Sequence, residues 1–181
     1  MSGTEPGERA DRFRRLHLET YADLLRFVER RVPASEAEDI VSAVFLTAWR
    51  RFDDITDDAR PWLFAVARKT MANGNRGWLR RQALDVRLVT LEPREPGDDG
   101  TGTAVRIDLE RALRGLRPAD REVLALIAFD GLTTEQAATV LGVRRTAFAM
   151  RLTRARERLR AALEPAPASA PHTLKEQAWT A

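Results

Sequence analysis

Arginine side chains crowd one stretch near the C-terminal end of the sequence, and guanidinium groups bind phosphate and guanine well. Seven arginines and a single acid, Glu157, lie between Arg144 and Arg160. Short or apolar side chains lie among these arginines, at Thr146, Ala149, Met150 and Thr153. Arginines next to small side chains can contact both the DNA backbone and the base edges of a major groove.

Eight residues form the predicted DNA-reading set: Arg144, Arg145, Thr146, Ala149, Met150, Arg151, Thr153 and Arg154. Arg145 and Arg154 are the candidates for contacts with guanine or phosphate. Arg144 and Arg151 are the candidates for phosphate contacts that position the protein without reading sequence. The methyl groups of the apolar members and of Thr153 suit the thymine methyl group.

A helix-turn-helix would position this set. Thr133 and Gln136 have the spacing of a capping box, and Gly142 suits the turn because it tolerates positive φ. The second helix is predicted from about Arg145 to Leu163. Its apolar stripe is spaced four, three and four residues apart, at Phe148, Leu152, Ala155 and Leu159. A lone basic helix is more often a solvated face, but the capped helix and glycine turn before it favour DNA binding.

A second basic segment suggests another nucleic-acid contact. From Arg60 to Leu84 the sequence has six basic residues and no acid. Pro61 is predicted to open a helix here, and residues 73–77, Asn-Gly-Asn-Arg-Gly, are predicted to form a break or loop. Trp78 beside this loop is suited equally to stacking on a base and to packing in the protein.

The remaining pattern predicts an all-α fold in two small helical domains. The first spans 11–89, with one or two helices ending at Pro33 and a helix over about 36–52 capped by Ser35 and Glu38. That helix has a long apolar stripe: Ile40, Val41, Val44, Phe45, Ala48, Trp49 and Phe52. An acidic, Pro- and Gly-rich linker is predicted over 90–106. The second domain, 107–164, has a helix from about Ile107 to Leu116 and another opened by Pro118, and the Pro/Ala-rich tail 165–181 is expected to be disordered.

Composition narrows the function classes. The 181-residue chain has a net charge of +3, 44% hydrophobic residues and no cysteine, so we expect neither disulfides nor a thiolate metal site. The two histidines, His17 and His172, are far apart in sequence. No phosphate loop, metal-ligand cluster or nucleophile motif appears, so no catalytic residues, metal, cofactor or enzymatic activity are predicted. With no apolar run of membrane-spanning length and no signal core, we expect a cytoplasmic protein without membrane insertion.

Taken together, these blocks resemble an RNA polymerase sigma factor of the extracytoplasmic-function (ECF) group of the sigma-70 family, over about residues 11–163. AEDIVSAVFLTAW, Ala37 to Trp49, resembles the family's polymerase-binding helix. PWLFAVAR followed by ANGNRG resembles its promoter-opening helix and loop. LRPADREVLALIAFDGLTTEQAATVLGV followed by RLTRARERL resembles its reader of the upstream promoter element.

The resemblance implies a sigma2-like bundle of three to four helices and a sigma4-like helix-turn-helix domain. It implies binding to core RNA polymerase (β and β′ subunits) and to promoter DNA. It is also compatible with an anti-sigma factor as a binding partner. Core polymerase would contact Glu38, Asp39, Ser42 and Arg50. The melted strand of the −10 element would contact Arg68, Lys69, Asn73, Asn75, Arg76, Trp78 and Arg80. The DNA-reading set would recognise the −35 element.

Several positions depart from the family's usual pattern. The polymerase-binding helix usually carries a glutamine and an acid where this chain has Ser42 and Ala43. The family often has asparagine at the position of Lys69 and lysine at that of Ala149. Because the last change removes a usual DNA contact, the promoter sequence does not transfer from relatives.

Two other functions compete with this interpretation. A free-standing helix-turn-helix regulator would explain the second domain, but it would leave the basic segment from Arg60 to Leu84 without a role. A nucleic-acid-processing enzyme would need a metal site or nucleophile that the sequence does not display. Whether DNA binding requires polymerase separates the first alternative from a sigma factor.

Overall fold

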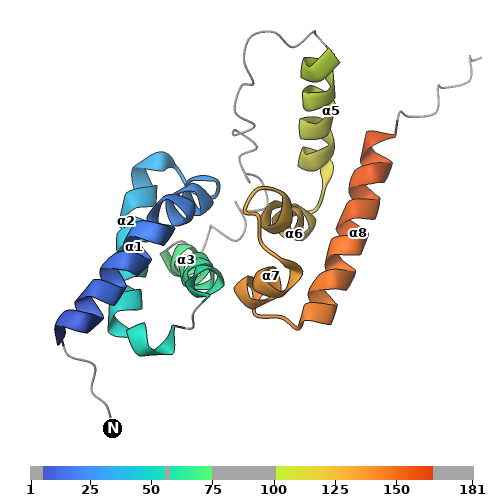
Figure 1. The fold of residues 1–181 in the computed structure, drawn as a ribbon. Helices are drawn as coiled ribbons and strands as arrows, with labels where there is room; N and C mark the ends of the chain where they lie inside the picture. Colours follow the sequence, from blue (N-terminus) through green and yellow to red (C-terminus); the bar gives the residue numbers. More distant parts are fainter. Residues whose placement is uncertain (1–5, 56–57, 75–100, 165–181) are drawn as a thin grey trace, which may run out of the picture.

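The computed structural model describes residues 6–55, 58–74 and 101–164, and all regular structure in these ranges is helical (Figure 1). The N-terminal bundle consists of α1 (Pro6–Glu29), α2 (Ala34–Arg50), the short 3-10 helix η1 (Phe52–Asp54) and α3 (Ala59–Gly74). The C-terminal bundle consists of α5 (Thr101–Gly115), α6 (Pro118–Ala128), α7 (Thr134–Leu141) and α8 (Arg145–Leu163). The predicted all-α class is confirmed. No helix in the described ranges is both long and apolar enough to cross a lipid bilayer.

The N-terminal bundle forms because α1, α2 and α3 each bury one apolar stripe against the other two. From α2 the stripe supplies Val41, Val44 and Ala48, all 1% exposed or less. Fully buried side chains from the neighbouring helices complete the interior: Leu24, Phe27, Val28, Leu63 and Phe64. Helical spacing of apolar residues thus explains the bundle.

The predicted cap of α2 is wrong. The helix begins at Ala34 with Pro33 as its N-cap, and no side chain caps it. Pro33 has the extended backbone of an N-cap (φ −56°, ψ 143°), and its carbonyl accepts the N–H of Glu36 at 2.9 Å. Ser35 therefore already lies within the first helical turn, where its hydroxyl cannot act as the N-cap. The helix also ends at Arg50, so Phe52 belongs to η1.

Two other helices begin earlier than the sequence pattern predicts. α3 begins at Ala59, which places Pro61 within the first turn, where a backbone N–H has no intrahelical partner to lose. α5 begins at Thr101, so the last residues of the predicted 90–106 linker are helical. The predictions that α6 opens with Pro118 and that α8 spans Arg145–Leu163 are confirmed.

In the C-terminal bundle, α5, α6 and α7 all pack against α8, which lies along one side of the bundle (Figure 1). Phe148 and Ala155 of α8 are fully buried, and Leu152 is 7% exposed. The fourth predicted stripe residue, Leu159, is partly buried against the same core. The long helix is therefore fixed along one side and leaves its other side to solvent.

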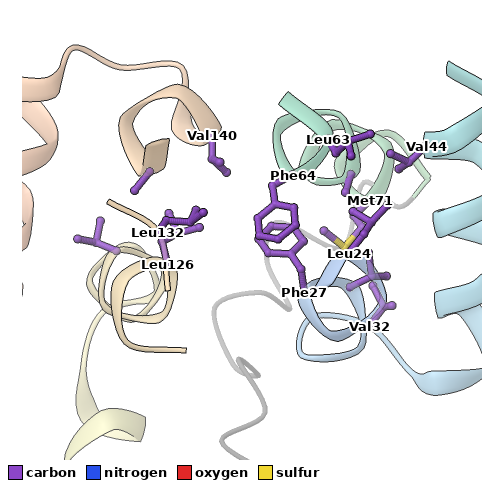
Figure 2. Close-up of a cluster of buried hydrophobic side chains, with 14 of the residues drawn as sticks. Leu24, Phe27, Val32, Val44, Leu63, Phe64, Met71, Leu126, Leu132 and Val140 are labelled. Carbon is purple, nitrogen blue, oxygen red and sulfur yellow. The ribbon is translucent and has the colours of Figure 1, made fainter. Parts of the chain in front are cut away.

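The two bundles pack against each other, an interface that the sequence did not predict. α3 lies against α7, and one continuous cluster of buried apolar side chains includes members from both bundles. Figure 2 shows Phe27 and Phe64 on the N-terminal side of this cluster, facing Leu126, Leu132 and Val140. The Phe27 and Phe64 rings stack with centroids 4.2 Å apart. Residues 90–100 of the predicted linker and the tail 165–181 lie outside the described residues.

Candidate nucleic-acid and protein interfaces

The helix-turn-helix has the local geometry that the sequence predicts. Gln136 donates its backbone N–H to the Thr133 hydroxyl at 3.2 Å, and the Gln136 side-chain oxygen accepts the Thr133 N–H at 2.9 Å. This reciprocal pair confirms the capping box. Gly142 has φ 64° and ψ 35°, and Val143 donates to the carbonyl of Ala138 at 3.0 Å. Glycine thus turns the chain in the left-handed conformation that ends α7 and starts α8.

All eight residues of the predicted DNA-reading set are exposed: Arg144, Arg145, Thr146, Ala149, Met150, Arg151, Thr153 and Arg154. Met150 is 56% exposed, so its apolar side chain is accessible for contact. The Thr153 hydroxyl donates to the Ala149 carbonyl at 3.1 Å, so its methyl group remains for apolar contact. The face combines guanidinium groups with small and apolar groups, which is the chemistry of phosphate and base-edge contact.

A basic cavity of about 660 Å³ opens beside this face, between α3, α6 and α8. Among the described residues, five arginines and two carboxylates line it: Arg68, Arg117, Arg151, Arg154, Arg158, Asp120 and Glu122. Asp120 accepts hydrogen bonds from Arg117 at 3.0 Å and from Arg158 at 2.8 Å. Arg158 of α8 is therefore tied to α6, whereas Arg117 pairs locally with the first turn of α6. Arg151 and Arg154 supply positive charge at the edge of the DNA-reading face.

The predicted −10 residues are divided between α3 and a segment outside the described residues. Lys69 and Asn73 are exposed on α3. Arg68 is not free, because its guanidinium holds the Glu122 carboxylate of α6, with Nε 2.8 Å from Oε1. Four predicted contacts lie outside the described residues: Asn75, Arg76, Trp78 and Arg80.

The outer face of α2 carries the predicted polymerase contacts, since Glu38, Asp39, Ser42 and Arg50 are all exposed. Leu46 lies on the same face, four residues after Ser42, and is 50% exposed. Sequence reasoning missed it. The apolar residue type alone did not indicate that Leu46 is exposed on this face. Its helical spacing from Asp39 and Ser42 could have placed it there.

Trp49 was predicted to belong to the buried stripe of α2, but it is 40% exposed. Its ring meets Phe13 of α1 edge-on, with centroids 5.1 Å apart, and the Arg9 guanidinium lies 5.3 Å from its centroid. α1 thus covers one side of the indole and leaves the other open. Leu46 and Trp49 give the α2 face an apolar centre beside its polar residues, a composition typical of a protein-binding surface.

Comparison with known proteins divides the chain at the same place as the fold. The family model described as Sigma-70 region 2 matches residues 16–84, which include α2 and α3. The model described as Sigma-70, region 4 matches residues 106–159, which include the helix-turn-helix. The two matches together span more than half of the chain.

Curated relatives match over most of their own length. The chain is 33% identical over 142 residues to the RNA polymerase sigma factor NccH of Alcaligenes xylosoxydans, covering 74% of this chain and 76% of that protein. It is 32% identical over 169 residues to the ECF RNA polymerase sigma factor SigL of Mycobacterium tuberculosis, covering 91% and 95% respectively.

Two solved structures resemble the fold. The sigma factor RpoE of Bartonella quintana, in complex with the anti-sigma factor NepR, superposes with a TM-score of 0.58 at 25% identity, covering 86% of this chain and 98% of that one. CnrH, in complex with the cytosolic domain of CnrY, superposes with a TM-score of 0.55 at 28% identity, covering 83% and 86%.

Proposed function

Because the chain belongs to the extracytoplasmic-function group of the sigma-70 RNA polymerase sigma factors, we propose that it binds core polymerase and directs initiation of transcription at specific promoters. The observation that carries the proposal is the exposed DNA-reading face of α8 behind a capped α7 and a left-handed Gly142. A basic α3 and an apolar-centred α2 face are present in the same chain.

In this proposal α8 reads the −35 element in the major groove. Phe148, Leu152 and Ala155 anchor the helix in the bundle, so its exposed face has a fixed direction. Arg145 stands at the first position of α8, where side chains of a recognition helix reach base edges. Arg144 and Arg151 neutralise phosphates, and Met150 meets a thymine methyl group.

We assign recognition of the −10 element to α3 and the residues that follow it. Lys69 and Asn73 present a cation and an amide on the exposed side of the helix. By family analogy, Asn75, Arg76, Trp78 and Arg80 complete a pocket for a base flipped from the melted strand. Unstacking a base step costs on the order of a few kcal/mol, so these contacts must return a similar free energy.

We assign binding of core polymerase to the outer face of α2. Leu46 and Trp49 would be buried against the β′ side of polymerase, with Glu38, Asp39, Ser42 and Arg50 around them. Aromatic and apolar residues at the centre with polar residues at the rim are the usual anatomy of a protein interface. Phosphodiester chemistry would belong to polymerase, and this chain would act as its non-enzymatic specificity subunit in the cytoplasm.

An anti-sigma factor is the further partner that we propose. The similar sigma factor RpoE was solved with an anti-sigma factor, and CnrH with the cytosolic domain of CnrY. This chain shares their fold over more than four-fifths of its length. The free-standing regulator is the less favoured alternative, because a region 2 match accompanies the region 4 match.

Run-off transcription on fragmented genomic DNA tests the function. Core polymerase, this chain, and the two together are compared, and RNA 5′ ends are mapped. We expect discrete start sites that require both proteins and share an upstream motif. No new start sites, combined with sequence-specific duplex binding by the chain alone, would overturn the proposal in favour of the free-standing regulator.

A further inference from the structure

The basic cavity beside the DNA-reading face has the size and the charge of a small-molecule site. Its volume of about 660 Å³ is within the range of pockets that hold small ligands. It lies where the first turn of α6 meets α8, two helices that pack against each other. Part of its lining, Arg117 and Arg158, is outside the DNA-reading set. The cavity therefore offers charged groups to which recognition of DNA by α8 assigns no role.

The charges around the cavity leave a positive surplus. Five arginines and two carboxylates among the described residues line it, which gives a net charge of +3. Arg68 and Glu122 pair with each other, with Nε 2.8 Å from Oε1. Arg151 and Arg154 form no ion pair with any residue that the structure describes. A phosphate monoester carries roughly 1.5 to 2 negative charges at neutral pH, so a ligand that balances this surplus needs at least two phosphate groups.

The carboxylate of Asp120 holds two of the arginines in place and is itself compensated. Its side chain is 9% exposed, its Oδ2 accepts from Arg117 Nε at 3.0 Å, and its Oδ1 accepts from Arg158 Nη1 at 2.8 Å. One carboxylate neutralises only one of these two cations. A guanidinium has five N–H groups, so both arginines keep donors for a ligand. Asp120 thus positions two cations at the cavity and leaves one positive charge in excess.

Apolar groups line the cavity beside these cations. They are supplied by Pro118, Ala119, Val123 and Leu141. An inorganic polyphosphate would gain nothing from these groups, whereas a nucleoside covers apolar surface with its base. Arginine also stacks its flat guanidinium on aromatic rings, so the same lining suits a base on two counts. The combination favours a nucleoside that carries several phosphates.

We propose that this cavity binds a nucleoside polyphosphate. Arg117, Arg151 and Arg154 bind the phosphates, and the nucleoside lies against the apolar lining at Pro118 and Leu141. The site itself follows from the cavity and does not depend on the proposed function. Its consequence does rest on that function: Arg151 and Arg154 belong to the DNA-reading set, so a bound nucleotide and DNA compete for them.

A first pair of variants removes one arginine inside the cavity or one outside it. Arg117 is 66% exposed and pairs with a carboxylate of its own helix end, Asp120, at 3.0 Å. Arg111 of α5 is 74% exposed and pairs in the same local way with Asp108, at 2.9 Å, but it does not line the cavity. Calorimetric titration of the full-length chain with ATP and with GTP, at fixed salt, gives the affinities.

We expect Arg117→Ala to weaken nucleotide binding on the order of tenfold, because a charge-assisted contact with phosphate is lost. Arg111→Ala should change it by less than about twofold, since exposed charges away from the ligand are screened. No binding of either nucleotide by the wild-type chain, or equal weakening by the two variants, would overturn the proposal.

A second pair adds a carboxylate and does not depend on the Asp120 pair. Ala119 is exposed at the second position of α6 and lines the cavity, whereas Ala34 is exposed at the first position of α2. Aspartate is favourable in the first turn of a helix, so both variants should fold, and circular dichroism checks this. Ala119→Asp should abolish nucleotide binding and Ala34→Asp should leave it unchanged. Retained binding in Ala119→Asp would place the nucleotide elsewhere.

Two further ligands separate the parts of the nucleotide. AMP has the nucleoside but one phosphate, and it should bind at least about tenfold more weakly than ATP because it leaves arginines uncompensated. Inorganic tripolyphosphate has the charge but no nucleoside, and it should also bind more weakly than ATP. Tripolyphosphate binding as tightly as ATP would overturn the assignment of a nucleoside ligand.

Competition with DNA is measured with a fluorescein-labelled, mixed-sequence duplex at matched ionic strength. ATP should displace the duplex from the wild-type chain, and displacement from Arg117→Ala should require on the order of tenfold more ATP. Equal potency on the two proteins would overturn competition at this cavity. A wild-type chain that binds no duplex would count against the proposed function instead, and the calorimetric comparison of the variants would still decide whether the nucleotide site exists.

Discussion

Asp130 and Arg31, which are 99 residues apart in the chain, form a buried ion pair with Oδ2 2.6 Å from Nη2. Buried charges are tolerated only when they are paired and hydrogen-bonded, and Arg30 and Phe27 complete this site. Because Arg31 belongs to the N-terminal bundle and Asp130 to the C-terminal bundle, the pair favours this docking: a docked arrangement that left either charge buried without its partner would be costly.

Asp130→Ala should destabilise the protein by about 3–5 kcal/mol, since the change leaves the Arg31 charge buried without its partner. The measurement is guanidinium unfolding followed by circular dichroism. Asp53→Ala is the matched control, because Asp53 is 83% exposed and only 3.7 Å from Arg9, and it should change stability by less than about 1 kcal/mol. Equal midpoints for the two variants would contradict a stabilising role of the Asp130 pair.

Gly142→Ala should destabilise the helix-turn-helix by about 1–2 kcal/mol, because a Cβ disfavours the left-handed backbone at φ 64°. No atom lies within 4 Å of the position a Cβ would take, so the effect is one of backbone alone. Gly115→Ala is the control: it also has open space, and it should be neutral or stabilising by up to about 1 kcal/mol. Thermal unfolding compares them, and a destabilising effect at Gly115 of equal size would refute the backbone argument.

Asp39→Arg and Leu46→Asp should each abolish co-purification with core polymerase, the first by reversing a charge and the second by placing a charge at the apolar centre of the α2 face. Both residues are exposed, so helical circular dichroism should not change. Asp11→Arg, an exposed position on α1, controls for net charge. Retained co-purification of both α2 variants would reject this face as the polymerase contact.

Asn73→Ala should impair open-complex formation on duplex promoters, because the variant loses an exposed amide at the end of α3 that we assign to a base of the melted strand. A template already melted at the start site should restore much of the activity, since the unstacking energy has been supplied. Transcript yield on paired and pre-melted templates gives the comparison. Equal impairment on both templates would mean that Asn73 has no part in melting.

Arg145→Ala should weaken binding to the preferred −35 sequence by about 1–3 kcal/mol and should weaken binding to other sequences much less, as expected for a base-reading residue. Arg151→Ala should weaken binding evenly, because phosphate contacts carry little base information. Ala149→Lys adds a donor and a charge, and it should shift preference at one base position. Selection from randomised upstream elements at fixed salt measures all three. An unchanged preferred sequence in Arg145→Ala and Ala149→Lys would exclude α8 as the reader.

Features that depend on neighbours in the chain were predictable from the sequence. The Thr133–Gln136 cap and the Gly142 turn follow from backbone groups three or four residues apart, so residue type and spacing are sufficient. The buried stripe of α8 and the start of α6 at Pro118 follow for the same reason. The cap of α2 was mispredicted because residue type favours Ser35 as the N-cap, whereas the helix begins at Ala34, behind Pro33, without a side-chain cap.

The sequence by itself thus determined an all-α chain with a helix-turn-helix and an exposed, arginine-rich face on α8. Only the tertiary structure decided which charges are free. Arg68 counted as a DNA contact by its type, yet Glu122 from α6 holds it, 54 residues away. Trp49 counted as core, yet α1 covers only one side of its ring. Pairing and exposure depend on groups brought together by packing of distant helices, and no local spacing rule carries that information.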